Sequence, residues 1–325
     1  MTRDHHSTTP GPHRRSPLAI ALVPIVVTLV LVLFAWPSAR LEPRGLPIGV
    51  AGPAAATHAM EQRLPGDAFD VERYADEASA REAVADREVY GAFVATPGGP
   101  KVLTASAASP VVAQMMTAAA NEQAPRGTTA DVEDVVASGH RGAALPSAVQ
   151  PLIIAGILTG VLSGVLASGA LRRTGLLVAG SVLAGLAATA VVQSWLGVVG
   201  GDWVANAAAL SLTVLALASV VAGLQAVLGA PGVALGALTM ILVGNPFSGI
   251  ASAPEMLPRP VGAIGQLMPP GAGGNLLRST GFFDGAAAGG HVAVLAAWAA
   301  GGLALLYLRS LRARRAATVP AVVPA

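Results

Sequence analysis

The hydrophobic pattern of the chain has one dominant feature, a long apolar block from Leu152 to Ile250 whose only charged residues are Arg172, Arg173 and Asp202. A helix needs roughly 20 apolar residues to cross a bilayer core about 30 Å thick. A globular helix instead keeps a polar face toward water. Divided at its charges and at the glycines near 229–232, the block predicts four membrane-spanning helices, at 150–171, 175–199, 203–228 and 232–250.

Two further apolar runs flank this block. Residues 18–36 follow Arg14-Arg15 and predict a first crossing. The run is longer than the apolar core of a signal peptide and ends in Trp36-Pro37, which favours an uncleaved helix over a signal peptide, including one of the twin-arginine type. Residues 291–308 predict a sixth crossing, and four arginines follow it: Arg309, Arg312, Arg314 and Arg315.

The segment 39–149 has a different character, because it holds nearly all the acidic residues and alternates strand-like with helix-like stretches. It predicts a small α/β domain outside the membrane. The expected strands are 46–50, 69–74, 89–95 and 102–105, and the expected helices are 54–64, 79–87 and 110–121. Ser79 and Glu82 fit a capping box at the start of one helix, whose buried stripe would be Ala80, Ala83 and Val84.

Residues 251–290 contain several prolines, which a single straight crossing cannot accommodate. The apolar stretches 261–268 and 275–283 between them are too short to span a bilayer. Short helices that re-enter the outer face of the membrane would satisfy both observations.

Arginines beside the helix ends set the expected orientation, because positively charged residues concentrate on the cytoplasmic side. With six crossings, Arg14-Arg15, Arg172-Arg173 and the C-terminal arginines all fall on one side. The sequence therefore predicts a polytopic α-helical protein of the plasma membrane with six transmembrane helices. An extracytoplasmic α/β domain lies between helices 1 and 2. The cytoplasmic tails are residues 1–17 and 309–325.

Composition narrows the classes of function. The chain is 53% hydrophobic and 12% charged, its net charge is +2, and it has no cysteine. These values argue against nucleic-acid binding and exclude disulfides and thiolate metal sites. We expect no cofactor and no metal site, although the tail histidines His5, His6 and His13 leave weak metal binding open. The acidic residues of the domain could include a carboxylate pair, but solvated faces carry such residues far more often, so we expect no catalysis.

Two patterns in the crossings are candidate functional features. Gly156, Gly160, Gly164 and Ser168 recur every four residues and predict a face for close helix packing, within the chain or in a dimer. The small residues Ala293, Ala297 and Gly301 predict a similar face in the last crossing. Asn245-Pro246 predicts either a helix terminus at the membrane interface or a helix break that acts as a gate.

Ionisable residues at mid-membrane depth usually mark ion-coupled transport. Here the strongly polar residues of the crossings are uncharged: Gln193, Asn206, Gln225 and Asn245. The chain also lacks the phosphate-binding motif of ATPases. If it transports a substrate, we expect a separate ATPase subunit to supply the energy.

The stretch NPFSGIASAPEMLPRPVGAIGQLMPPGAGGNLLRSTGFFDG before the last crossing resembles the end of type-2 ABC-transporter permeases. The segments LPIGV, SAREAVADREVYGAFVATP and VLTASAASPVVAQMM resemble the YhgE/Pip-like branch of that superfamily. This resemblance implies a permease subunit of an exporter, which forms a homodimer or a heterodimer with a similar permease. Family members contact their ATPase between the second and third crossings, where this chain offers only a short connector with Arg172 and Arg173.

The leading hypothesis is therefore export of a hydrophobic or amphiphilic substrate across the lipid bilayer. Arg172 and Arg173 would then be the coupling surface for the ATPase. The alternative is a cell-surface membrane protein that does not transport, whose outer domain is a receptor or an envelope-assembly module.

Overall fold

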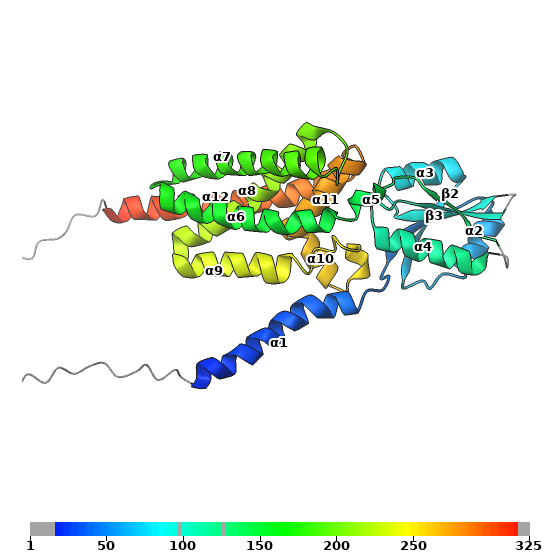
Figure 1. The fold of residues 1–325 in the computed structure, drawn as a ribbon, viewed down its shortest axis with the longest axis horizontal. Coiled ribbons are helices and arrows are strands. Elements are labelled where there is room, and N and C mark those ends of the chain that lie inside the picture. Colours follow the sequence, from blue (N-terminus) through cyan, green and yellow to red (C-terminus); the bar gives the residue numbers. More distant parts are fainter. Residues whose placement is uncertain (1–16, 97–98, 125–127, 318–325) are drawn as a thin grey trace, which may run out of the picture.

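The structure, a computed structural model, describes residues 17–96, 99–124 and 128–317. It consists of a bundle of helices and an α/β domain that lie end to end (Figure 1). Arg14-Arg15 and the three tail histidines lie outside the described residues.

Within the described part of the chain, five helices are long and apolar enough to cross a membrane. They are α1 (Pro17–Ala39), α6 (Leu145–Leu166), α7 (Ala170–Thr189) with its π-helical extension η1 (Ala190–Trp195), α8 (Trp203–Leu228) and α12 (Ala288–Ala317). In the most apolar 18-residue stretch of α8, 72% is buried inside the structure. The corresponding share is 22–33% for α6, α7 and α12, so α8 is the centre of the bundle. The protein is thus a helical membrane protein.

The helix expected at 232–250 is shorter than predicted. It consists of α9 (Ala230–Thr239) and the π-helical turn η2 (Met240–Gly244). At 1.5 Å per residue it is about 22 Å long, less than the roughly 30 Å of a bilayer core. Pro246 lies just beyond this end, and because it has no N–H it cannot donate the next helical hydrogen bond. The sixth crossing therefore stays a prediction.

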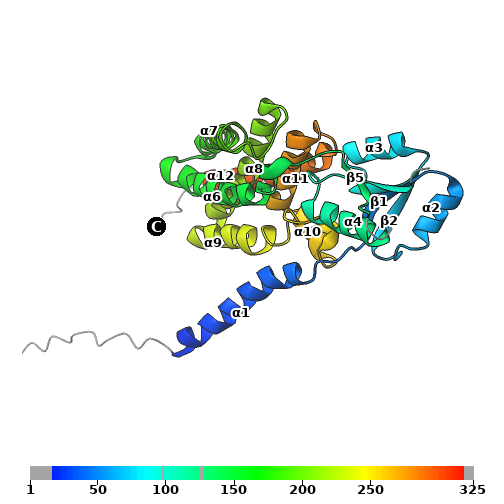
Figure 2. The same cartoon turned by 45° about the vertical axis from the view of Figure 1, so that its right-hand side comes forward.

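Helix α1 stands apart from the other helices in both views and reaches the bundle at η2 (Figures 1 and 2). Its side chains from Leu22 to Leu31 are largely exposed.

Three of the four small residues predicted to form a packing face on α6 do contact another helix. A side chain at Gly156 would overlap Leu217 of α8, and one at Gly160 would lie 2.7 Å from the carbonyl oxygen of Ala218. Gly164 faces Gln225, also on α8. Ser168 does not belong to this face, because α6 ends at Leu166 and Ser168 is exposed. The face thus serves packing within the chain.

The predicted small-residue face of the last crossing does not pack within the chain, and its use in a dimer stays a prediction. Ala293, Ala297 and Gly301 are exposed, and the buried side of α12 carries Leu295, Ala299, Gly302 and Leu306 instead. A side chain at Gly302 would overlap the backbone of Ser219 in α8. Helices α8 and α12 therefore approach each other closely at Gly302, one residue after the Gly301 that the spacing of the small residues predicts.

The proline-rich segment forms three short helices between the bundle and the domain. They are η3 (Pro254–Met256), α10 (Val261–Gln266) and α11 (Pro269–Phe282). Pro269 and Pro270 open α11, where a missing N–H costs no hydrogen bond. Helix α11 is almost entirely buried and contacts α6, α8 and α12. Re-entry of this segment into the membrane stays a prediction.

The domain is built on a five-stranded sheet with the order β2-β1-β3-β4-β5, in which only β3 and β4 are antiparallel neighbours. Its strands are β1 (Leu46–Ala51), β2 (Phe69–Tyr74), β3 (Gly91–Thr96), β4 (Gly99–Thr104) and β5 (Asp131–Asp134). Its helices are α2 (Ala54–Glu61), α3 (Glu77–Ala85), α4 (Pro110–Gln123) and the short α5 (Gly139–Gly142). The first four strands coincide with the predicted ones to within two or three residues at each end.

Each face of the sheet has its own core, because side chains alternate along a strand. Leu103 packs with α3 on one face, and Val102 packs with α4 on the other. Ala80, Ala83 and Val84 are buried as predicted. The capping box lies three residues earlier than expected, because Asp76 is the N-cap and Ser79 is its partner.

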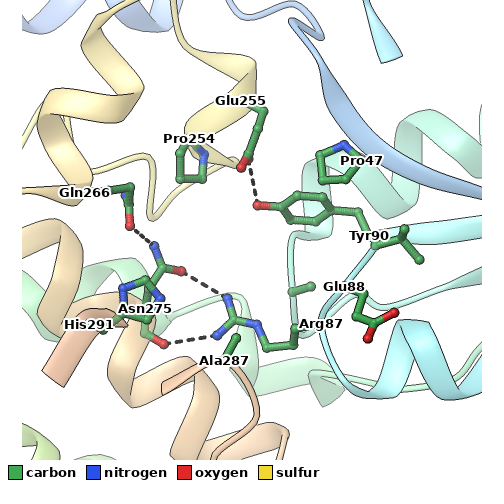
Figure 3. A pocket seen from close by; sticks show the side chains of 12 residues that line it. Pro47, Arg87, Glu88, Tyr90, Pro254, Glu255, Gln266, Asn275, Ala287 and His291 are labelled. Atoms are coloured by element: carbon green, nitrogen blue, oxygen red, sulfur yellow. Dashed lines mark hydrogen bonds between the residues drawn. The ribbon is translucent and has the colours of Figure 1, made fainter. Parts of the chain in front are cut away.

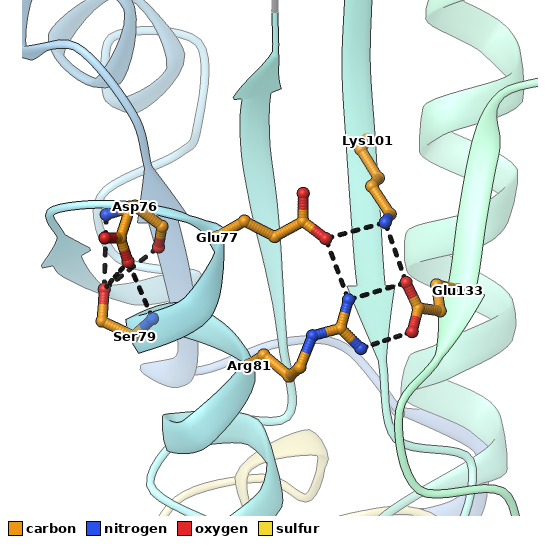
Figure 4. Close-up of polar contacts among 6 residues, drawn as sticks. All are labelled: Asp76, Glu77, Ser79, Arg81, Lys101 and Glu133. Atoms are coloured by element: carbon orange, nitrogen blue, oxygen red, sulfur yellow. Dashed lines mark hydrogen bonds and ion pairs between the residues drawn. The ribbon is translucent and has the colours of Figure 1, made fainter.

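The sequence pattern missed strand β5, which is short and acidic. Its Glu133 belongs to an ion-pair network with Arg81, Lys101 and Glu77, shown in Figure 4. Lys101 Nζ lies 2.7 Å from Glu77 and 2.8 Å from Glu133. The network connects α3 to both β4 and β5. It holds the pKa of Glu133 at about 2, with the hydrogen bond from Arg81 as the largest cause.

Replacement of Gly302 by leucine should destabilise the bundle, because the new side chain must displace the α8 backbone. Overpacking of this kind costs about 1–3 kcal/mol. The adjacent Gly301→Leu is the matched control, since Gly301 has open space around it. Thermal unfolding of the two variants in detergent measures the difference, and equal melting temperatures would contradict the close approach of α8 and α12.

Glu133→Gln should destabilise the protein at pH 7, because it removes both ion pairs of the carboxylate. The folded-state pKa of Glu133 is depressed, so its contribution is complete above about 4.5 and is lost as the pH falls toward about 2. The stability difference between wild type and variant should shrink over this range. Urea unfolding followed by tyrosine fluorescence tests this, and a difference that is independent of pH would count against it.

Candidate functional site

A partly enclosed polar region lies where the α/β domain meets the bundle. A pocket of about 310 Å³ opens there, with Arg87 and Tyr90 on the domain side and Glu255, Asn275 and His291 on the bundle side (Figure 3). We call it the junction pocket.

Arg87 reaches the pocket from an unusual backbone position. It follows the end of α3 with a φ of 62°, in the left-handed region that glycine usually occupies at this place. Its N–H donates to the carbonyl of Val84, and that of Glu88 donates to Ala83 at 2.9 Å, which closes the helix. A residue other than glycine costs free energy here, on the order of 1 kcal/mol. The long side chain of Arg87 makes contacts that glycine could not make.

The guanidinium of Arg87 bonds to α11 of the bundle. Its Nη1 donates to Ser279 Oγ and to the carbonyl oxygen of Asn275, and its Nη2 donates to Asn275 Oδ1 at 3.3 Å. The group also lies 5.2 Å from the centroid of the Phe283 ring, in a cation–π contact. Burial lowers the pKa of this guanidinium. Arg87 therefore joins the domain to α11.

Arg278 approaches the same amide oxygen from behind. Its side chain is buried, with Nη1 2.9 Å from Asn275 Oδ1 and Nη2 2.8 Å from the carbonyl oxygen of Ile250. Its Nε is buried without a hydrogen-bond partner in the described part of the chain. The neutral Oδ1 of Asn275 thus accepts hydrogen bonds from two cations, Arg87 and Arg278.

A relay of amides fixes the direction of this oxygen. Gln266 Nε2 donates to the carbonyl of Ser248 at 2.7 Å, so its Oε1 must face Asn275. Asn275 Nδ2 donates to that Oε1, also at 2.7 Å. The Oδ1 of Asn275 consequently has to point to the two arginines.

Tyr90 and Glu255 make a second bridge across the junction. The hydroxyl of Tyr90 donates to Glu255 Oε2 at 2.8 Å. Burial, and next the negative charge of Glu255, raise the pKa of this phenol, so it stays a donor. Beside it, the backbone of Glu42 and Arg44 donates to the carbonyls of Met256 and Glu255. The domain is thus anchored to the η3 segment as well as to α11.

Sequence reasoning did not find this pocket. It did single out the segment 275–283 as apolar, and Asn275 and Arg278 within that segment were the available signal, since polar groups in such runs are often functional. What no pattern could show is that Arg87, far away in the chain, faces them.

The other predicted site residues lie elsewhere. Asn245 and Pro246 follow directly after η2, where Ser248 Oγ donates to the carbonyl of Asn245 at 2.7 Å. This position fits the helix-terminus interpretation, and the gate stays a prediction. Of the polar residues in the crossings, Asn206 binds Gln193, the carbonyl of Gly200 and Thr280, which ties η1 and α11 to the start of α8.

The expected coupling arginines are not in a connector. Helix α7 begins at Ala170, so Arg172 and Arg173 lie in its first turn and the connector is residues 167–169. Arg172 is exposed. Arg173 turns inward and donates to Gln225 Oε1 at 2.8 Å, toward the C-terminal end of α8, where the helix dipole favours a cation. Only Arg172 of the pair is positioned to meet a partner.

Comparisons with known protein families, curated proteins and solved structures give no match to this chain.

Proposed function

We propose that this chain is the membrane permease subunit of an ABC-type exporter for a hydrophobic or amphiphilic substrate. In this proposal a separate ATPase supplies the energy, and the subunit pairs with a second copy or a similar permease. The observation that supports it best is the junction pocket, whose walls come from both units. A ligand there touches the bundle and the domain together, as a substrate passing from the membrane to an outer vestibule would.

The proposed orientation is supported by the distribution of charge. The connector between α6 and α7 and the C-terminal part of α12 lie at the end of the bundle remote from the domain (Figure 1). That end carries Arg172, Arg173 and four arginines of α12, whereas Asp202, Glu255 and Asp284 lie at the domain end. Arginine-rich helix ends favour the cytoplasm. The α/β domain is then extracytoplasmic.

Six crossings remain part of the proposal, because the chain must return to the domain side after α8. It leaves α8 at Gly229, at the arginine-rich end, and residues 254–256 contact the domain. The helix Ala230–Gly244 runs along the bundle between these points (Figure 1). Local thinning of the bilayer accommodates a short helix at a modest cost in free energy.

One observation favours the alternative of a surface receptor or envelope-assembly module. A groove of about 510 Å³ lies at the end of the domain away from the bundle, with Met60, Leu64 and Phe93 in its lining. A partner that binds the domain without touching the bundle would bind in this groove.

Single-cysteine labelling should establish the topology, since the natural chain has no cysteine. In intact cells a membrane-impermeant maleimide should label Gly66→Cys and Ala251→Cys but not Ser168→Cys or Ala230→Cys. All four positions are exposed. Labelling of all four after permeabilisation is the control. Equal labelling of residues 230 and 251 in intact cells would contradict a crossing by α9.

Transport is tested with vesicles that contain the chain alone or together with a candidate ATPase encoded beside it. Efflux of an amphiphilic dye should require ATP and both proteins, and Arg172→Glu should reduce it after correct insertion has been verified. Arg63→Glu, an exposed arginine of the domain, is the matched control. Efflux driven by a pH gradient alone would overturn the ABC-exporter proposal. No efflux under any condition would favour the receptor or assembly module.

A further inference from the structure

The junction pocket is lined by the guanidinium group of Arg87, and that of Arg278 lies behind Asn275, with no carboxylate bonded to either. Across the described ranges 17–96, 99–124 and 128–317, neither Arg87 nor Arg278 forms an ion pair. All of their hydrogen bonds go to neutral oxygens of Asn275, Ser279 and Ile250.

This arrangement is costly. A buried charge loses several kcal/mol of hydration, which an opposite charge normally offsets. Here two like charges share one amide oxygen instead. Glu255 also lines the pocket and its negative charge acts on Arg87, but its carboxylate accepts the hydroxyl of Tyr90 and forms no ion pair with either guanidinium in the described ranges. Figure 3 shows the Glu88 side chain pointing away from the pocket.

The pocket leaves space and donors for an external counterion. Arg87 donates three hydrogen bonds to α11. A guanidinium group has five N–H donors. The remaining donors of Arg87 adjoin a volume of about 310 Å³, lined also by Gln266 and His291. Guanidinium groups bind phosphate and carboxylate through paired N–H donors.

We propose that the junction pocket binds an anionic group, a phosphate or a carboxylate. Arg87 contacts it directly, and Arg278 adds positive potential from behind Asn275. The pocket lies beside the apolar helices α10 and α12, so the group belongs to the head of a membrane amphiphile or to a free anion. Binding itself does not require transport, and only the identification of this ligand as cargo rests on the proposed function.

The test uses the full-length chain in a neutral detergent and two probes. The first is inorganic phosphate, measured by equilibrium dialysis. The second is phosphatidylglycerol, measured by native mass spectrometry after reconstitution into vesicles of equal parts phosphatidylglycerol and phosphatidylcholine. Wild type should bind phosphate if a free anion is the ligand. It should retain phosphatidylglycerol over phosphatidylcholine if the ligand is a lipid head group.

In either case Arg87→Gln should weaken binding about tenfold or more, the effect expected from removal of a charged hydrogen-bond donor. Arg87→Lys should restore part of it, and the exposed control Arg63→Gln should bind like wild type.

Asn275→Asp separates anion binding from a purely structural role of the arginines. It places a carboxylate between the two guanidinium groups and removes the Nδ2 donor to Gln266 Oε1, so it should weaken binding of the external anion while both arginines remain. Equal binding by wild type and Arg87→Gln, or binding of neither probe by wild type, would overturn the proposal. Anion binding without ATP-dependent efflux would overturn only the transport function, and efflux without anion binding only this site.

Discussion

One amide oxygen, Oδ1 of Asn275, lies at the centre of the contact between the two units of this protein. It accepts hydrogen bonds from Arg87 of the domain and from Arg278 of the bundle, and the relay through Gln266 leaves it no other orientation. A carboxylate at this place would neutralise the arginines internally. An amide satisfies their geometry without cancelling their charge. The junction therefore combines a rigid connection with an unbalanced positive potential.

The bundle follows a different principle, because its helices cannot rely on the hydrophobic effect while they face lipid. Their cohesion depends on close contact. Glycines let α6 and α12 approach α8 from two sides, and the central position of α8 follows from these contacts. Polar side chains such as Asn206 are used at the ends of the bundle, where turns leave carbonyl groups to be satisfied. These close contacts therefore restrict the order in which the helices can pack around α8.

Periodicity and length predicted six spanning helices, of which five are long and apolar enough in the described part of the chain, and the first four strands, since each rests on local hydrophobic pattern. Strand β5 was missed because three of its four residues are acidic: only Val132 packs against a core, and Glu133 is held by ion pairs. Spacing of small residues identified the contact face of α6 but not the face with which α12 contacts α8, because several small residues of α12 offer competing registers. The junction pocket was beyond prediction, because Arg87, Glu255 and Asn275 come from three segments that only the tertiary fold brings together.

The cores of the α/β domain are completed by residues that are synthesised long after it. Met256 and Ala253 belong to the core beneath α4, and Phe283 belongs to the core beneath α3. Ribosomes add roughly 5–20 residues per second, so these side chains follow β5 after a delay on the order of ten seconds. During that interval the domain waits beyond the growing bundle with part of both cores uncovered. Completion of both cores thus waits for synthesis of the segments that adjoin the bundle, and a chain that stalls before Phe283 carries an unfinished domain.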